Sequence, residues 1–413
     1  MYKSIWSTKN IRYYLLAGGI SRLGDVLSGM AFLFLAYDLT ESSLHTTIMA
    51  IAETLPYLLF GLIGGVVADW LPKKKLLIYL DLLRIPLVLS IVFLYYVDAL
   101  TYVYLLIVSF LIQSIGCFFN PAHRSVLPAI TEEEERTSAN SWNDSLTRGV
   151  TVLTPFLTVW LLNSFGTIHL FTIDALTYAV SALFLTKIHW KENDAPTGIK
   201  SVKALFSAIL EFAVWAKNQA TIKNLFIFTF LTVFFNTWVW QVGLLLALTE
   251  ISSESEALYS MLQGVFGGVV ILTNLILPYF IKTMTLRIYL IGAAIWGAGI
   301  AYYGALFEIS HFFIGVAIVG IGLPIAGLAR VYLLQTLVPE NKLGRAFSTN
   351  AVLLYFSNTI SLATYGLLVS FISIQTLMLG SGLLILFISA GPLLFQTVKL
   401  SKFRRGFPVH LFK

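Results

Sequence analysis

Charged residues are scarce in this sequence. Lys, Arg, Asp and Glu together make up only 12% of its 413 residues, whereas apolar residues make up 57%. A water-soluble domain carries roughly 25% charged residues. The shortage therefore excludes an ordinary soluble protein, and it indicates that lipid surrounds most of the molecular surface.

Cysteine and the familiar signatures of catalytic sites are also missing. Cys117 is the single cysteine, so the chain can form neither an internal disulfide nor a site with two thiolate metal ligands. The sequence has no His-Glu-x-x-His, Gly-x-Ser-x-Gly or Gly-Lys segment, which argues against metalloproteases, serine hydrolases and P-loop nucleotide sites. We therefore expect a protein that is not an enzyme, holds no metal ion and needs no cofactor.

Apolar runs are what the chain has in abundance. They extend over about 18 to 28 residues each, and about 20 helical residues suffice to cross a hydrocarbon layer of about 30 Å. We predict an all-α membrane protein in which twelve transmembrane helices form two six-helix bundles. The expected spans are 11–38, 44–69, 76–97, 100–121, 138–163, 167–187, 222–248, 257–281, 287–307, 311–334, 343–371 and 374–397.

The basic residues mark one side of the membrane. Lys and Arg occur before the first span, after each even-numbered span and in the C-terminal tail, whereas the loops near 40–43, 98, 163–166, 250–256, 308 and 370–374 have none. Cytosolic loops are enriched in these two residues. The pattern predicts a multi-pass protein of the bacterial cytoplasmic (plasma) membrane with both termini in the cytosol. The net charge of +6 lies mainly in these loops, which favours membrane lipids over nucleic acid as a partner.

The longest polar gap divides the spans into six and six, as in transporters built from internal repeats. We predict a first bundle at 1–187, a cytosolic linker at 188–221, a second bundle at 222–398 and a basic cytosolic tail at 399–413. Apolar residues of the linker recur at helical spacing, which predicts an amphipathic helix on the inner membrane surface. These residues are Val202, Leu205, Phe206, Ile209, Phe212, Ala213 and Ala216.

The loop after the second span carries a recognisable motif. Gly65-Val-Val-Ala-Asp69 is followed by Trp-Leu-Pro and then by Lys73, Lys74 and Lys75. This segment resembles the loop signature of the major facilitator superfamily, although Trp70 and Pro72 replace the usual basic residue and glycine. Other segments resemble the drug:proton antiporter branch of that superfamily, which includes macrolide efflux proteins and enterobactin-type siderophore exporters. They are Ser21-Arg-Leu-Gly-Asp25, Asp81-Leu-Leu-Arg84, Asn120-Pro-Ala-His-Arg124 and Leu127-Pro128 after the fourth span, Ile173-Asp174-Ala-Leu-Thr-Tyr178, and Leu343-Gly-Arg345.

The resemblance implies a secondary transporter that exports a small molecule by alternating access in exchange for protons. The proton gradient would then be the energy source. We expect the protein to act as a monomer. Within transport, an exporter of an anionic metabolite or siderophore is the alternative to an exporter of drug-like molecules. A non-transporting membrane sensor or lipid-handling protein is the alternative from another class, because fold alone does not decide function.

The loop signature and the next span supply candidates for gating. Gly65 allows close approach of two helices, and Asp69 can pair with a base or cap the N-terminus of a neighbouring helix. Lys73 and Lys74 then face anionic lipid or serve only to set the topology. Asp81 and Arg84 lie three residues apart on one helix face, where they can form a structural pair.

Ionisable residues within the spans are the remaining candidates. Each costs about 2.5–3.5 kcal/mol near the bilayer centre, so it is expected to be functional or paired. Asp25 and Glu53 are our candidates for proton coupling, and the alternative for Asp25 is an ion pair with Arg22 or Arg148. Anionic groups of a substrate would need arginines, and span seven lines the cavity in the superfamily. The substrate-cavity candidates are Arg22, Arg148, Trp238, Gln241 and Arg330.

Overall fold

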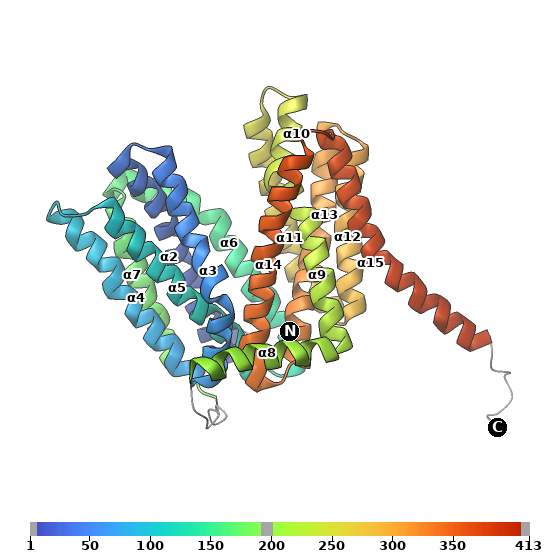
Figure 1. Cartoon of the computed structure of the whole chain (residues 1–413), viewed down its shortest axis with the longest axis horizontal. Coiled ribbons are helices and arrows are strands. Elements are labelled where there is room, and N and C mark those ends of the chain that lie inside the picture. The colour runs from blue at the N-terminus through green and yellow to red at the C-terminus, as the bar shows by residue number, and fades with distance from the viewer. Residues whose placement is uncertain (1–5, 191–200, 406–413) are drawn as a thin grey trace. The chain divides into compact units, whose positions relative to one another are not determined.

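The computed structural model describes residues 6–190 and 201–405, without the side chains of Ser43, Glu256 and residues 394–405. Twelve of the helices in this part of the chain are long and apolar enough to cross a membrane, which confirms the predicted all-α architecture (Figure 1). The first six spans are α2 (Lys9–Thr40), α3 (Ser43–Trp70), α4 (Lys73–Tyr96), α5 (Tyr102–Val126), α6 (Glu133–Phe165) and α7 (Ile168–Thr186).

The seventh span is made of three consecutive pieces. They are α9 (Ala220–Trp238), a π-helical turn at Val239–Gly243 and α10 (Leu244–Ile251). The extra residue in a π turn widens the helix locally, and such turns are frequent at functional sites. The last five spans are α11 (Ser255–Phe280), α12 (Leu286–Ala305), α13 (Ile309–Leu337), α14 (Leu343–Leu368) and α15 (Ile374–Arg405).

The fourth span is longer than expected. We predicted its end at residue 121, but α5 continues through Pro121 to Val126. Pro121 has no N–H to donate to the carbonyl of Cys117, four residues earlier. That carbonyl lies against Gly64 of α3, so closely that a Cβ on Gly64 would collide with it. The segment Asn120-Pro-Ala-His-Arg124 therefore belongs to the last turns of the helix, not to a loop.

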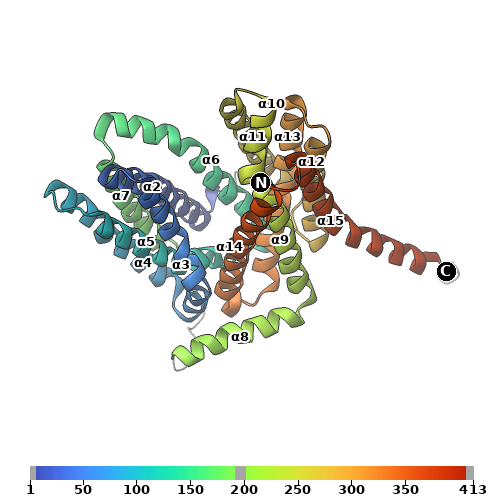
Figure 2. The ribbon, with the colours of Figure 1, turned by 45° about the horizontal axis from the view of Figure 1, so that its top comes forward.

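The predicted amphipathic helix is present as α8 (Val202–Asn218). Its buried residues Ala208, Phe212 and Ala216 form one face. The opposite face exposes Val202, Phe206, Leu210 and Val214, which recur every four residues. Both views show α8 lying crosswise at the end of α3 (Figures 1 and 2). Residues 191–200 of the predicted linker and 406–413 of the predicted tail lie outside the described residues.

The chain forms two compact units. The first comprises Met1–Lys223 together with Asn274–Thr283 and Val331–Phe356, and the second comprises the remaining parts of α9 to α15. Thus the ends of α11, α13 and α14 that adjoin the Lys- and Arg-bearing loops belong with the first six spans. We call this end of the first unit the basic side. The segment boundaries expected at 187, 221 and 398 stay predictions.

Candidate functional site

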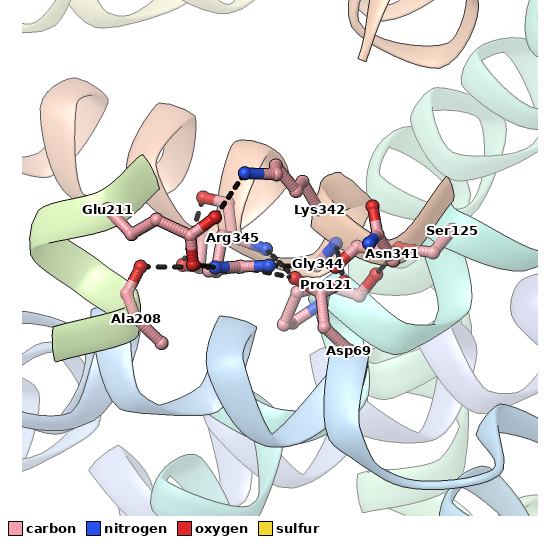
Figure 3. Close-up of polar contacts among 10 residues, drawn as sticks. Asp69, Pro121, Ser125, Ala208, Glu211, Asn341, Lys342, Gly344 and Arg345 are labelled. Carbon is pink, nitrogen blue, oxygen red and sulfur yellow. Dashed lines mark hydrogen bonds and ion pairs between the residues drawn. The ribbon is translucent and has the colours of Figure 1, made fainter. Parts of the chain in front are cut away.

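The loop signature meets the start of α14 on the basic side. Asp69, the penultimate residue of α3, is buried. Its carboxylate accepts hydrogen bonds from the backbone N–H groups of Gly344 at 2.6 Å and Arg345 at 3.1 Å (Figure 3). The first N–H groups of a helix have no partner within that helix. Asp69 therefore caps α14 from a different helix, where its negative charge also favours the helix N-terminus.

Arg345 connects three segments at this point. Its Nε donates to Asp69 at 3.0 Å, while one terminal nitrogen donates to the Ala208 carbonyl at 3.1 Å and to Glu211 at 3.3 Å (Figure 3). Lys342 forms a second ion pair with Glu211. The guanidinium of Arg345 is buried and is therefore sensitive to the loss of any partner. We call Asp69, Arg345, Lys342 and Glu211 the α3–α8–α14 latch.

Two glycines allow the latch to close. A Cβ on Gly65 would collide with the Ser348 side chain and the Gly344 carbonyl, and a Cβ on Gly344 would collide with the Gly65 carbonyl. Gly65 and Asp69 are four residues apart, so they lie on one face of α3. The spacing of the motif therefore places the carboxylate where the two backbones come closest.

The lysines of the motif differ from one another in their surroundings. Lys73 is buried at the start of α4. Lys74 donates its ammonium hydrogens to the carbonyls of Thr186 at 2.8 Å and Ile188 at 2.7 Å. These carbonyls lie at the end of α7, where a cation is favourable. Of the three lysines, Lys75 alone is exposed, and Lys74 joins the start of α4 to the end of α7.

A second polar cluster on the basic side joins α6 to α13. Asn140 and Gln335 exchange two hydrogen bonds, at 2.6 and 3.3 Å, although both are buried. Thr137 donates to the Lys282 carbonyl at 2.6 Å. We did not predict this cluster. The available signal was the run of small polar residues at 137–141, which would be costly to bury without partners.

The predicted pair of Asp81 and Arg84 is present within α4 at 3.5 Å. Ser181 donates to Asp81 at 2.7 Å. Arg84 lies over the rings of Phe119 and Tyr178, at 4.9 and 5.1 Å from their centroids. Both charged groups are buried, so ring faces and a hydroxyl replace the water that they lose.

Asp25 does not form the ion pair that we considered with Arg22 or Arg148. Its carboxylate accepts a hydrogen bond from the Tyr178 hydroxyl at 2.7 Å. Gly29 follows one turn later on the same face of α2, and a Cβ there would lie 3.9 Å from Oε1 of Glu53. Asp25 therefore faces α7 through Tyr178 and lies one helical turn before the place where α2 approaches Glu53 of α3.

The substrate-cavity candidates fall into different surroundings. Arg148 pairs with Asp144 at 2.7 Å, and Asn274 donates to the same oxygen atom at 2.7 Å. We overlooked Asp144, although it is an ionisable residue within a predicted span. Arg22 is exposed on α2.

The other three candidates belong to the second unit. Trp238 is buried and stacks on Tyr365 with ring centroids 5.4 Å apart, which is a packing role. Gln241 is exposed within the π turn. Arg330 lies within electrostatic range of Tyr289. Gln241 is thus the most exposed side chain of this group.

Glu211 gives the latch a dependence on pH. The hydrogen bond from Lys342 lowers the pKa of the Glu211 carboxyl, and the charges of Lys342 and Arg345 act in the same direction. Because the folded-state pKa is depressed, the stabilisation is present above the ordinary pKa of about 4.3 and is lost as pH falls through the lower folded-state value.

We expect Glu211→Gln to speed hydrogen exchange of α8 at pH 7, since the ion pairs with Lys342 and Arg345 are lost. The difference from the unchanged protein should start to shrink as pH falls below about 4.3 and should vanish below the lower folded-state pKa, where Glu211 is as neutral as glutamine. Hydrogen exchange across a pH series, corrected for the intrinsic rate, measures this. Glu254→Gln is the control, because Glu254 is an exposed glutamate in a loop that carries no Lys or Arg. A difference that stays constant down to the lowest pH would contradict the assigned role.

The twelve spans and their capped, charge-paired helix ends define a membrane transporter of the major facilitator architecture. The chain belongs to the transmembrane secretion effector family of this superfamily, whose model matches residues 5–406. This is a family of transporters and not of enzymes, as we expected.

Individual relatives support the same assignment. Macrolide efflux protein A of Streptococcus pyogenes is 26% identical over 405 residues, which cover 92% of this chain and 94% of the relative. Macrolide efflux protein A of Enterococcus faecalis is 27% identical over 338 residues, covering 76% and 98%. Among solved structures, a bacterial homologue of the iron transporter ferroportin in an outward-facing state matches with a TM-score of 0.72 at 15% identity, covering 92% and 98%. The last likeness concerns the fold alone.

Proposed function

We propose that this protein exports an amphipathic, drug-like small molecule from the cytosol in exchange for protons. It would act as a monomer in the bacterial plasma membrane, with both termini in the cytosol. The relatives described as macrolide efflux proteins support export of a small molecule. The observation that carries the proton coupling is the buried Oε1 atom of Glu53 in the contact of α2 with α3, with Asp25 one helical turn away on α2.

Glu53 is suited to carry a proton. Its Oε1 atom is buried and has no hydrogen-bond partner within the described residues. An ionised carboxylate is costly to bury without a donor, so Glu53 favours the protonated form while it is closed off and can release the proton when water reaches it. Asp25, one turn away from this contact, differs because the Tyr178 hydroxyl already donates to it. The two carboxylates thus provide a proton carrier and a hydrogen-bonded acceptor.

The two polar clusters of the basic side provide the gate for the same cycle. Access from the cytosol requires Asp69 to release Gly344 and Arg345, and Asn140 to release Gln335. The first set of bonds joins α3 to the start of α14, and the second joins α6 to the end of α13. Because polar bonds of this kind are exchanged for bonds to water on opening, the two states can be close in free energy.

Transport in everted membrane vesicles tests the coupling. A gradient of one pH unit supports about tenfold accumulation for each exchanged proton. With a radiolabelled amphipathic drug as probe, Asp25→Asn and Glu53→Gln should lose this gradient-driven accumulation but keep exchange of labelled for unlabelled drug, because exchange needs no net proton movement. Glu254→Gln is the matched control. Gradient-driven accumulation that persists in both variants would refute the proposal.

A further inference from the structure

Two exposed arginines of the first unit interact electrostatically with the same tyrosine and form no ion pair with a described carboxylate. Arg22 on α2 and Arg124 on α5 are both exposed, and none of the ion pairs among the described residues includes either of them. Arg84 and Arg148, by contrast, each have an aspartate on the same helix, at 3.5 and 2.7 Å. Positive charge is therefore left uncompensated at Arg22 and Arg124.

Aromatic rings gather at the same place. Tyr57 of α3 and Tyr355 of α14 stack with centroids 4.9 Å apart and an angle of 26° between their planes. Asn120 of α5, which is exposed, donates to the Tyr57 hydroxyl at 3.0 Å. Arg22 and Arg124 both lie within electrostatic range of Tyr355. Four helices thus bring two cations and a pair of stacked rings together.

The depth of this cluster distinguishes it from a surface charge patch. Arg22 is thirteen residues beyond the first residue of α2, Lys9, which corresponds to about 20 Å along a helix. Tyr355 is twelve residues into α14, or about 18 Å. An exposed guanidinium at such depth faces water and not lipid tails. Arg124 lies in the last turn of α5, where the helix C-terminus also attracts it, and its charge acts on the same Tyr355 ring.

We propose that Arg22 and Arg124 bind a carboxylate of the exported molecule, while the stacked Tyr57 and Tyr355 contact its apolar body. A guanidinium matches a carboxylate with two parallel hydrogen bonds, and tyrosine rings offer apolar faces beside a polar edge. The substrate class is therefore an amphipathic carboxylic acid. This inference rests on the proposed export function and names the chemistry of its substrate.

Profiling of all exported compounds tests the inference, because it does not depend on choosing a substrate. Media from cells with and without the protein are compared by untargeted mass spectrometry, and the enriched compounds are sorted by functional group. We expect acids with an apolar body. Arg22→Gln and Arg124→Gln should each lower their export about tenfold or more, as expected for loss of a charge-assisted hydrogen bond. Arg287→Gln, an exposed arginine beside the basic loops, is the matched control.

The outcomes separate this inference from the function on which it rests. Absence of any enriched compound would overturn the export function itself. Enriched compounds that lack an acidic group, or acids that both arginine variants export at the full rate, would overturn the inference and leave export intact. Arg22→Lys keeps the positive charge and should retain part of the export that Arg22→Gln loses. Quantification of each variant in the membrane guards against loss through misfolding, and equal loss in the lysine and glutamine variants would also count against the inference.

Discussion

Asp69→Asn should accelerate hydrogen exchange at the backbone amides of Gly344 and Arg345 by about 10- to 100-fold. Both amides lie in the first turn of α14, where no carbonyl of the same helix is available, and both donate to the Asp69 carboxylate. Hydrogen bonds to a charged group contribute about 1.5–3 kcal/mol, which corresponds to this change in rate. Asparagine offers one acceptor oxygen, and its NH2 group would face the hydrogen atoms of Arg345.

Exchange of peptides that cover residues 340–350, followed by mass spectrometry, measures this effect. Asp98→Asn is the matched control, because Asp98 is exposed in a loop on the side away from the basic loops. The same peptides should exchange normally in this variant. Unchanged exchange at Gly344 and Arg345 in Asp69→Asn would show that the α3–α8–α14 latch is not what protects the start of α14.

This contact also shows how far the sequence could lead. The spacing of Gly65 and Asp69 predicted a close helix approach and a carboxylate that pairs with a base or caps a helix. Its partner is 275 residues away in the chain. Arg345 was visible in a motif, but no local pattern joins it to Asp69 or to Glu211 of α8. Hydropathy and charge are local properties, whereas the pairing depends on how the helices pack.

The errors have a common physical cause. We ended the fourth span at residue 121 and overlooked Asp144 and the polar cluster of α6, because polar groups are usually excluded from apolar surroundings. In the structure several such groups have partners within the protein. Lys74 binds carbonyl groups at the end of α7, and His123 stacks on Tyr14 with centroids 4.2 Å apart. Composition does not reveal which polar residues find such partners.

Arg84→Met should destabilise the protein by about 3–5 kcal/mol, the usual cost of breaking a buried ion pair. Asp81 is fully buried, so without its guanidinium partner it must either hold an uncompensated charge or take up a proton, and both cost stability. Asp25 lies close enough to Arg84 to interact with it electrostatically, so it would lose compensation as well. The interaction with the Tyr178 and Phe119 rings would disappear at the same time.

A double-mutant cycle separates the ion pair from these other contacts. Thermal unfolding in detergent is compared for Arg84→Met, Asp81→Leu and the double variant, with Arg287→Met as the control for an exposed arginine. Replacing both members of a buried pair by apolar residues is often neutral, so the double variant should be more stable than either single one. If its loss of stability equals the sum of the losses in the two single variants, the interaction between Asp81 and Arg84 contributes no stability of its own. The stabilising effect of Arg84 in the first unit would then come from the rings and Asp25.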